Sequence, residues 1–286
     1  MLEREPSRTA FAAAAYRAVH QVLEGAYFFQ DPFAVPILGL EPDALRADPA
    51  AGDDRRGIRF FVVARSAIAE GALKRGVEEH GVGQLVVLGA GLDTFAYRNP
   101  FEGRLRVFEV DHPATQAWKR RRLDEAGIPI PASLTYVPVD FEREDVTERL
   151  AAAGLKPGVR TVFTWLGVVP YLTKEAIDAT LAQIAAHPGG AEVVFDYSEP
   201  REMIDPALRS HYEERAARVA AIGEPFLSFF VPAALHAQLG ALGFGQIDDL
   251  DIPAILLRLF GEPKDPAVQR PSPSRRTGGH VIFAAT

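Results

Sequence analysis

Cysteine is absent from this 286-residue chain. Disulfide bonds, zinc sites built on thiolates and catalysis by a thiol are therefore excluded. Long apolar runs are missing too, since no uncharged stretch approaches the roughly 20 residues that cross a bilayer. The charged, alanine-rich N-terminal segment lacks the apolar region of a signal peptide. We therefore expect a soluble, cytoplasmic protein that does not associate with membranes.

Basic charge is in deficit, because the formal net charge at pH 7 is −7. A general nucleic-acid-binding protein presents a basic surface, so nucleic acid is not expected as a partner. The sequence also lacks a G-x-S-x-G motif, a G-x-x-x-x-G-K-S/T phosphate loop and a clustered set of His and Asp metal ligands. The expected partner is a small-molecule substrate, with no bound metal; the oligomeric state is left open.

The stretch 84–113 organises the rest of the sequence. Its apolar run 85–88, LVVL, is rich in β-branched residues and too short for an ordinary helix. Such a run is typical of a strand buried on both faces of a parallel sheet. It is followed by Gly89, Ala90 and Gly91, where missing side chains allow a ligand to lie against the backbone. The alternative is a tight strand-to-helix turn that binds nothing.

A second strand-like run, 105–110, leads to Asp111, which lies 20 residues after Gly91. This is the distance expected between a glycine turn and the acid at the tip of the next strand. A carboxylate in that place accepts hydrogen bonds from ribose hydroxyls. The sequence therefore predicts a site for a nucleoside cofactor.

The residues after the glycine turn distinguish between two cofactors. A dinucleotide fingerprint needs a third glycine, but Thr94 stands in its place, and Asp93 would repel a diphosphate. S-adenosylmethionine has no phosphate, and its ammonium group is compatible with Asp93. The pattern predicts S-adenosylmethionine as the cofactor, with an NAD-dependent oxidoreductase as the alternative.

The remaining pattern indicates an α/β fold in which helices alternate with strands. Further strands are predicted at 135–139, 161–165, 191–197, 246–250 and 280–284. Helices are predicted at 9–23, 59–79, 112–127, 232–242 and after Thr173. Seven strands with helices between the first five form a doubly wound, Rossmann-like sheet. Residues 41–57 and 261–278, which are rich in proline and other polar or small residues, are predicted to be loops.

We expect a single domain made of four regions. They are a helical N-terminal cap (1–80), a cofactor-binding core (81–198), a substrate-lid insertion after the fifth strand (199–231) and a C-terminal helix with strands (232–286). Insertions beyond strand ends shape substrate pockets in α/β folds. Alternatively, the cap is only a packed helical layer, and the insertion's Phe226, Phe229 and Phe230 make plain core contacts with it.

Further side chains are candidates for the cofactor site. Arg65, on the second predicted helix, either pairs with a cofactor carboxylate or is a solvated helix arginine. Asp140, at the tip of the third strand, either accepts from an adenine amino group or caps the next helix, a role open to Asp145 as well. Phe141 would then pack on the adenine ring. The basic run 119–122 is expected on a solvated helix face.

Four segments carry a resemblance to a known family: VVLGAGLDTFAYR, FEVDHPATQAWKR, YVPVDF and VPYLT. They are similar to the leucine carboxyl methyltransferase family, and most of all to its bacterial branch of S-adenosylmethionine-dependent O-methyltransferases. The similarity runs from Ser7 to the C-terminal strand. It implies the seven-stranded fold of class I methyltransferases, with the last strand antiparallel and beside the sixth.

The resemblance also implies roles for individual residues. Gly89 and Gly91 would form the cofactor turn, Asp111 would hold the ribose, Asp140 and Phe141 would bind the adenine, and Arg65 would bind the methionine carboxylate. One position departs from the family pattern, because Leu166 stands where relatives usually have a glutamate near the cofactor's amino group. Tyr171, in the same segment, either faces the substrate or is a core tyrosine with a satisfied hydroxyl.

These expectations combine into a functional hypothesis: an S-adenosylmethionine-dependent O-methyltransferase that moves a methyl group to a carboxylate or hydroxyl oxygen of a small molecule by direct displacement. The sulfonium is already an activated leaving group, so the enzyme mainly aligns the reacting atoms. A carboxylate acceptor needs no general base, because it is ionised at neutral pH. His112 is expected to be structural, and no catalytic residue is named. The alternative is a non-catalytic protein that binds the cofactor.

Overall fold

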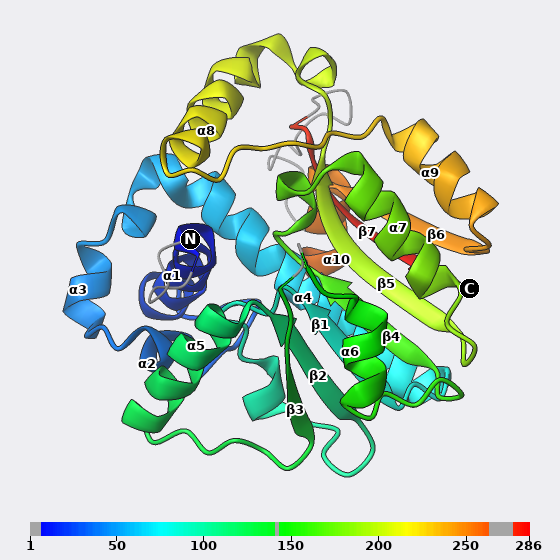
Figure 1. Ribbon diagram of the computed structural model, residues 1–286. Coiled ribbons are helices and arrows are strands. Elements are labelled where there is room, and N and C mark those ends of the chain that lie inside the picture. Colours follow the sequence, from blue (N-terminus) through cyan, green and yellow to red (C-terminus); the bar gives the residue numbers. More distant parts are fainter. Residues whose placement is uncertain (1–6, 141–142, 263–276) are drawn as a thin grey trace.

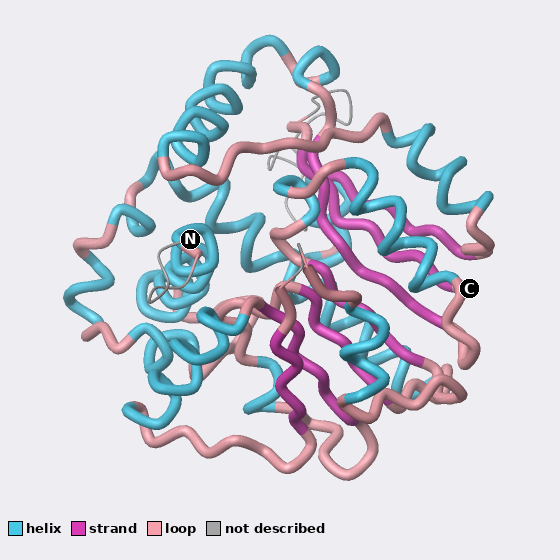
Figure 2. Tube along the Cα trace, viewed as in Figure 1, coloured by secondary structure: helices cyan, strands magenta, loops and turns pink. Residues whose placement is uncertain are grey.

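The computed structural model describes residues 7–140, 143–262 and 277–286. Its centre is a seven-stranded sheet with the order β3-β2-β1-β4-β5-β7-β6 (Figures 1 and 2). The strands are β1 (Gln84–Leu88), β2 (Arg106–Asp111), β3 (Leu134–Pro138), β4 (Thr161–Trp165), β5 (Ala191–Ser198), β6 (Gln246–Asp251) and β7 (Gly279–Ala285). The first five pair in parallel, and β7 is antiparallel to β5 and β6. The predicted fold class is confirmed.

Helices cover both faces of the sheet (Figure 1). One face packs against α6 (Val146–Ala152), α7 (Lys174–Ala185) and α9 (Pro232–Ala241), and the other against α4 (Arg56–Glu79) and α10 (Ile252–Phe260). Side chains alternate between the faces of a strand, so Val86 and Leu88 contact the first layer, whereas Leu85 and Val87 lie on the α4 side. Because both faces are buried, β1 reads as a continuous apolar run.

The N-terminal residues form a helical cap beside the sheet. Its helices are α1 (Arg8–Leu23), α2 (Ala34–Leu38) and α3 (Pro42–Arg46), which share an apolar cluster with α5 (Pro113–Glu125). The expectation of a plain loop over 41–57 is wrong, because this stretch contains α3 and two short 3₁₀ helices, Pro49–Ala51 and Asp53–Arg55. The prolines that suggested a break stand at the first positions of these helices, where the missing N–H is not needed.

The insertion after β5 folds into a helix that stands apart from the sheet. It contains two 3₁₀ helices, η5 (Arg201–Met203) and η6 (Pro206–Leu208), followed by α8 (Arg209–Ala221) at the top of Figure 1. The chain then returns to the sheet, where the Phe230 N–H donates to the Ser198 carbonyl oxygen at 3.0 Å. Helix α10 was not predicted; it begins at once after β6, with the Asp251 carboxylate accepting from the Ala254 N–H at 2.9 Å.

One side chain of the basic run 119–122 contradicts the expected solvated face. Lys119 is 1% exposed, and its Nζ lies 2.7 Å from Oε2 of the equally buried Glu109 on β2. A buried ammonium is tolerated when an opposite charge lies in contact with it. Within the described part of the chain, no helix has the length and apolar character needed to cross a membrane.

Candidate cofactor site

The C-terminal ends of the parallel strands meet at one edge of the sheet, and the chain turns sharply there after β1. Gly89 and Gly91 have φ angles of 65° and 48°, a region that residues with a side chain rarely adopt. A Cβ on Gly89 would lie 2.5 Å from Val168 Cγ2, and one on Gly91 would lie 3.2 Å from Ala10 Cβ. The turn therefore needs glycine for its conformation and because α1 and the loop after β4 approach it closely.

Asp111, the last residue of β2, closes this turn. One of its carboxylate oxygens accepts a hydrogen bond from the Gly91 N–H, and the other accepts from the His112 N–H at 2.6 Å. Burial raises the pKa of Asp111, while these two backbone hydrogen bonds act in the opposite direction. Each oxygen keeps a further lone pair for an incoming hydroxyl donor. The 20-residue spacing in the sequence thus corresponds to a direct contact.

Asp93 and Thr94 hold the chain that follows the turn. Asp93 Oδ1 accepts from the Phe95 N–H at 2.8 Å, at the start of the 3₁₀ helix η3 (Phe95–Arg98). Thr94 is fully buried, and its hydroxyl donates to Asp31 Oδ2 at 2.6 Å. Thr94 therefore ties the turn to the N-terminal cap, at the position where a dinucleotide-binding chain needs glycine.

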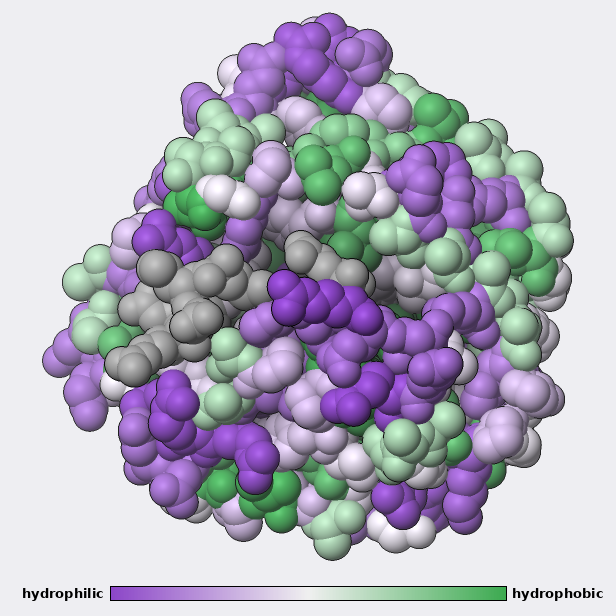
Figure 3. All heavy atoms as spheres, in the orientation of Figure 1, coloured by the Kyte–Doolittle hydropathy of each residue, from purple (hydrophilic) through white to green (hydrophobic). Residues whose placement is uncertain are grey.

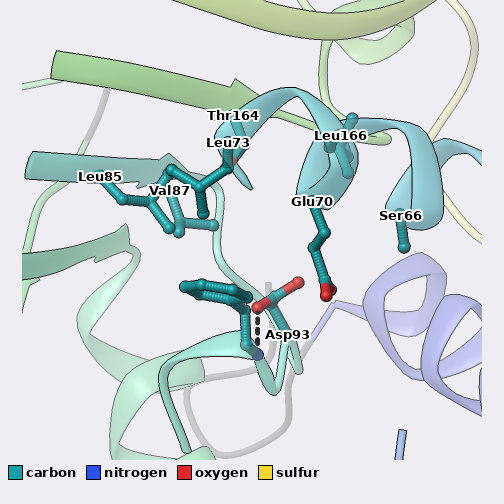
Figure 4. Close-up of a pocket in the computed structure, with 10 residues that line it drawn as sticks. Ser66, Glu70, Leu73, Leu85, Val87, Asp93, Thr164 and Leu166 are labelled. Carbon is teal, nitrogen blue, oxygen red and sulfur yellow. Dashed lines mark hydrogen bonds between the residues drawn. The ribbon is translucent and has the colours of Figure 1, made fainter. Parts of the chain in front are cut away.

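A small cavity lies between this turn and α4 (Figure 4). It is lined by Ser66, Ala69, Glu70, Leu73, Leu85, Val87, Asp93, Phe95, Thr164 and Leu166. The carboxylates of Glu70 and Asp93 point toward one another in it (Figure 4). Glu70 was not among the predicted site residues. In the sequence, Glu70 is marked only by its position beside the apolar face of α4. The periodicity of apolar residues predicts that face, but it does not indicate that Glu70 has a function.

Arg98 neutralises part of this acidic wall. Its guanidinium donates to both carboxylate oxygens of Glu70, one of them at 2.6 Å, and its Nε lies 3.5 Å from Asp31. Burial raises the pKa of Glu70, and the Arg98 guanidinium opposes that shift. Asp93 makes no ion pair with any residue that the structure describes. Its carboxylate is therefore the less neutralised acid of the cavity.

Arg65 lies at the same edge, above β4 and β5. Its Nη1 donates to Asp196 Oδ2 at 2.9 Å, and Asp196 Oδ1 accepts from the Gly167 N–H at 2.6 Å. The side chain of Arg65 is only 12% exposed, so the interpretation as a solvated helix arginine is wrong. The structure places Arg65 beside the loop that contains Leu166.

The adenine candidates lie beyond the end of β3. Asp140 is half-buried, and its backbone carbonyl accepts from the N–H groups of Arg143 and Glu144. The cap of α6 is Asp145, whose side chain accepts from the Glu148 N–H at 3.0 Å. Asp140 is therefore not the helix cap. Phe141 lies outside the described residues.

Two further side chains were expected near the strand tips. Tyr171, in the 3₁₀ helix η4 (Val169–Tyr171), packs its ring 5.4 Å from that of Phe226. Its hydroxyl makes no hydrogen bond with another described residue, and its role in facing the substrate stays a prediction. His112 caps α5, because its Nδ1 accepts from the Ala114 N–H at 3.2 Å. This is the structural role expected for it.

The topology and the site together define a class of protein. The class I methyltransferase fold has three features that are present here. They are five parallel strands, an antiparallel last strand between β5 and β6, and an acid at the end of β2 that contacts the glycine turn after β1. The donor set also fits S-adenosylmethionine, because it combines a closely approached backbone turn, carboxylates without a phosphate-binding third glycine, and a nearby guanidinium.

Comparison with known sequences identifies the family. The profile of the family "Leucine carboxyl methyltransferase" matches residues 10–185, which is more than half of the chain. This protein therefore belongs to the leucine carboxyl methyltransferase family. It is similar to the Bacillus subtilis "Putative S-adenosyl-L-methionine-dependent methyltransferase YktD", with 36% identity over 187 residues, covering 65% of this chain and 61% of that protein. A Streptomyces avermitilis protein named in the same terms is 35% identical over 183 residues, covering 62% and 64% of the two chains.

The matched region thus spans less than two thirds of each of these two relatives. The names of the relatives bear out S-adenosylmethionine as the cofactor of this family. Among solved structures, "a putative methyltransferase from Thermobifida fusca YX" superposes with a TM-score of 0.59 at 18% identity, covering 99% of this chain and 95% of that one. A second one, from Streptomyces avermitilis and assigned to the DUF574 family, gives 0.56 at 13% identity. At these identities the structures support the fold alone.

Proposed function

We propose that this protein is an S-adenosylmethionine-dependent O-methyltransferase that acts on a carboxylate or hydroxyl oxygen of a small molecule. The observation that carries the proposal is the contact between the Gly91 N–H and the Asp111 carboxylate. It joins a bare backbone turn to an acid with lone pairs to spare, which suits an adenosyl group lying across the ends of β1 and β2. The absence of a third glycine at Thr94 argues against a diphosphate-containing cofactor.

Each group of the cofactor finds a residue of suitable chemistry in this proposal. Asp111 holds the ribose diol, Asp140 and Phe141 take the adenine, Arg65 binds the carboxylate, and Asp93 faces the ammonium. S-adenosylmethionine supplies a methyl group on a sulfonium, which is an activated leaving group. The chain itself binds, orients and shields the reacting atoms, and such positioning contributes about 7–11 kcal/mol in favourable cases.

Leu166 does not remove the acidic side of the site. It lines the same cavity as Glu70 and Asp93, so two carboxylates remain where the family resemblance leads one to expect a glutamate. Arg98 already binds Glu70, which leaves Asp93 as the acid that we assign to the ammonium. This supports cofactor binding in spite of Leu166, which is a property that an enzyme and a protein that only binds the cofactor would share.

The acceptor oxygen needs little help from the protein if it is a carboxylate. Such a group is ionised at neutral pH, and His112, which follows the end of β2, is committed through Nδ1 to capping α5. We place the acceptor between the edge of the sheet and the insertion 199–231. In this arrangement α8 and its following loop act as a lid, and residues 1–80 act as a cap.

The test is isothermal titration of S-adenosylhomocysteine and NADH into the wild type, Asp111→Asn and the control Asp124→Asn, which changes an exposed acid on α5. We expect the wild type and the control to bind S-adenosylhomocysteine and not NADH. We expect Asp111→Asn to bind it about 10- to 100-fold more weakly, because charge-assisted hydrogen bonds to the ribose are lost. Equal affinity in wild type and Asp111→Asn, or preferential binding of NADH, would contradict the proposal. Methyl transfer from labelled S-adenosylmethionine to acids and phenols then separates an enzyme from a binding protein.

A further inference from the structure

Four arginines with buried or half-buried side chains in the described ranges are paired with acids. The pairs are Arg17–Asp31, Arg59–Glu24, Arg65–Asp196 and Arg98–Glu70. Arg215, on α8, has no such partner among the residues that the structure describes. Its Nη2 donates to the Ser198 hydroxyl at 3.3 Å, and its Nε is buried without any hydrogen-bond acceptor.

The electrostatic surroundings of Arg215 leave a positive charge without a counter-ion. Asp196 and Arg65 are the charged groups that influence the pKa of Arg215, and Asp196 already accepts from Arg65 and from the Gly167 N–H. Burial lowers the pKa of Arg215. A guanidinium in this position is costly unless an anion joins it, because its desolvation is not offset by a paired carboxylate.

Aromatic rings surround this guanidinium. Its Cζ lies 5.1 Å from the ring centre of Phe226 and 5.7 Å from that of Tyr212. The ring of Tyr171 lies 5.4 Å from Phe226, and the buried hydroxyl of Tyr212 also lacks a partner among the described groups. Figure 3 shows hydrophilic side chains at the top of the molecule, where α8 lies in Figure 1, and apolar side chains lower in the same view. The inner side of the helix therefore combines a cationic group with apolar walls.

Arg215 also lies at the edge of the sheet that carries the cofactor turn. Ser198 is the last residue of β5, and η4, which contains Tyr171, follows β4. The loop after β4 contacts the cofactor turn through Val168 and Gly89. A molecule bound to Arg215 would therefore lie at the same edge of the sheet as the proposed methyl donor.

We infer that Arg215 is an acceptor-binding residue that holds a carboxylate of the acceptor, while the aromatic or apolar body of that molecule packs against Tyr171, Tyr212 and Phe226. This inference rests on the proposed function, and it adds to it a residue that selects the acceptor. The lid helix contributes the charge, so an anionic acceptor supplies the missing counter-ion, whereas a neutral analogue leaves the guanidinium unpaired.

The test uses aromatic acids and their primary amides as matched probes: benzoate with benzamide, cinnamate with cinnamamide, and 2-naphthoate with 2-naphthamide. Each is titrated into the 286-residue wild type with and without saturating S-adenosylhomocysteine. We expect at least one acid to bind about tenfold or more tightly than its amide, because a charge-assisted hydrogen bond is lost with the amide. Arg215→Met is expected to remove this preference, and Arg215→Lys to retain part of it. Arg218→Met, which changes an exposed arginine on the same helix, is the control.

Thermal unfolding distinguishes recognition from a structural role. We expect the Tm of Arg215→Met to equal or exceed that of the wild type, because an unpaired buried charge has been removed. Equal affinity for acids and amides, an acid preference that survives in Arg215→Met, or loss of S-adenosylhomocysteine binding in that variant would overturn the inference. An acid preference in a wild type that fails to bind S-adenosylhomocysteine would retain the anion site and reject the methyltransferase proposal.

Discussion

At the scale of single residues, the most informative group outside the cofactor turn is Glu109. It lies on β2 two residues before Asp111, is fully buried, and accepts from Lys119 through Oε2, while Oε1 has no partner among the described groups. Burial raises the pKa of Glu109 to about 7, although the Lys119 ammonium opposes the shift. A carboxyl group that titrates near neutrality therefore lies directly beneath the proposed ribose site.

This shift predicts a dependence of stability on pH. The folded-state pKa of about 7 exceeds the ordinary value of 4.5, so the folded protein holds this proton more tightly than the unfolded chain does. The resulting stabilisation is fully present below about pH 4.5 and is lost as the pH rises to about 7. Urea titrations at several pH values measure the free energies of unfolding of the wild type and of Glu109→Gln. We expect the wild-type value minus the Glu109→Gln value to fall between about pH 4.5 and about pH 7. Glu125→Gln, which changes an exposed residue, should parallel the wild type. If the free energy of unfolding of Glu109→Gln changed with pH in the same way as that of the wild type, the raised pKa would not belong to Glu109.

At the scale of elements, a buried ionic network joins the N-terminal cap to the cofactor turn. Asp31, between α1 and α2, accepts from Thr94 and lies 3.5 Å from both Arg17 and Arg98. Arg17 in turn donates to the Leu92 carbonyl oxygen at 2.6 Å. The cap therefore fixes the backbone that follows Gly91, and its helices are more than a covering layer.

Removing the charge of Asp31 is expected to be strongly destabilising. Asp31→Asn leaves Arg17 without its buried counter-ion and removes one of the two acids beside Arg98, and breaking such an arrangement costs about 3–5 kcal/mol. Asp43→Asn is the matched control, because the Asp43 side chain is 99% exposed and its pair with Arg46 is worth within about 0.5 kcal/mol. Urea denaturation measures both values. A loss below about 1 kcal/mol in Asp31→Asn would show that this network does not hold the cap.

At the scale of the whole molecule, the cap and the lid meet across the site. The Ser7 hydroxyl lies 3.0 Å and 3.1 Å from the two carboxylate oxygens of Glu224, and the Thr9 N–H lies 3.3 Å from one of them. Ser7 also caps α1, and Glu224 follows α8. Ser7 and Glu224 are 217 residues apart in the sequence. Their hydrogen bonds join the two regions that are proposed to enclose the substrates.

A double-mutant cycle tests this contact. Ser7→Ala removes the helix cap and is expected to cost about 1 kcal/mol. Combined with Glu224→Gln, it is expected to show a coupling energy of about 0.5–1.5 kcal/mol, because both changes remove the same charge-assisted hydrogen bonds. The same cycle with Glu214→Gln, an exposed acid on α8, is expected to show none. Additive effects for Ser7 and Glu224 would mean that cap and lid are energetically independent.

The features that were predictable from the sequence are those that short segments specify by themselves. The apolar run before Gly89 and the spacing to Asp111 are local patterns, and the structure brings them into the expected contact. The helix predicted after Thr173 is α7, and the Thr173 hydroxyl caps it by accepting from the Ala176 N–H, a contact that depends only on the residues that follow. The prolines of 41–57 mark helix starts as well as breaks, so a loop prediction fails there, and the sequence pattern did not predict α10.

The burial and pairing of charged side chains depend instead on elements that are distant in the chain. Lys119 stands in a run of basic residues, and only the packing of α5 on β2 buries it against Glu109. Arg65 finds Asp196 from 131 residues away. Glu70 becomes part of the cofactor wall because α4 lies against the loop after β1.

By itself, the sequence determined the order of the seven strands along the chain, the glycine turn and the acid that closes it, because backbone conformation and apolar periodicity act over a few residues. Only the tertiary structure decided which charges are buried, which of them are paired, and that Arg215 is left without a counter-ion. Burial and pairing are properties of surfaces that come together from separate elements, and the free energy of a charge is set by those surroundings.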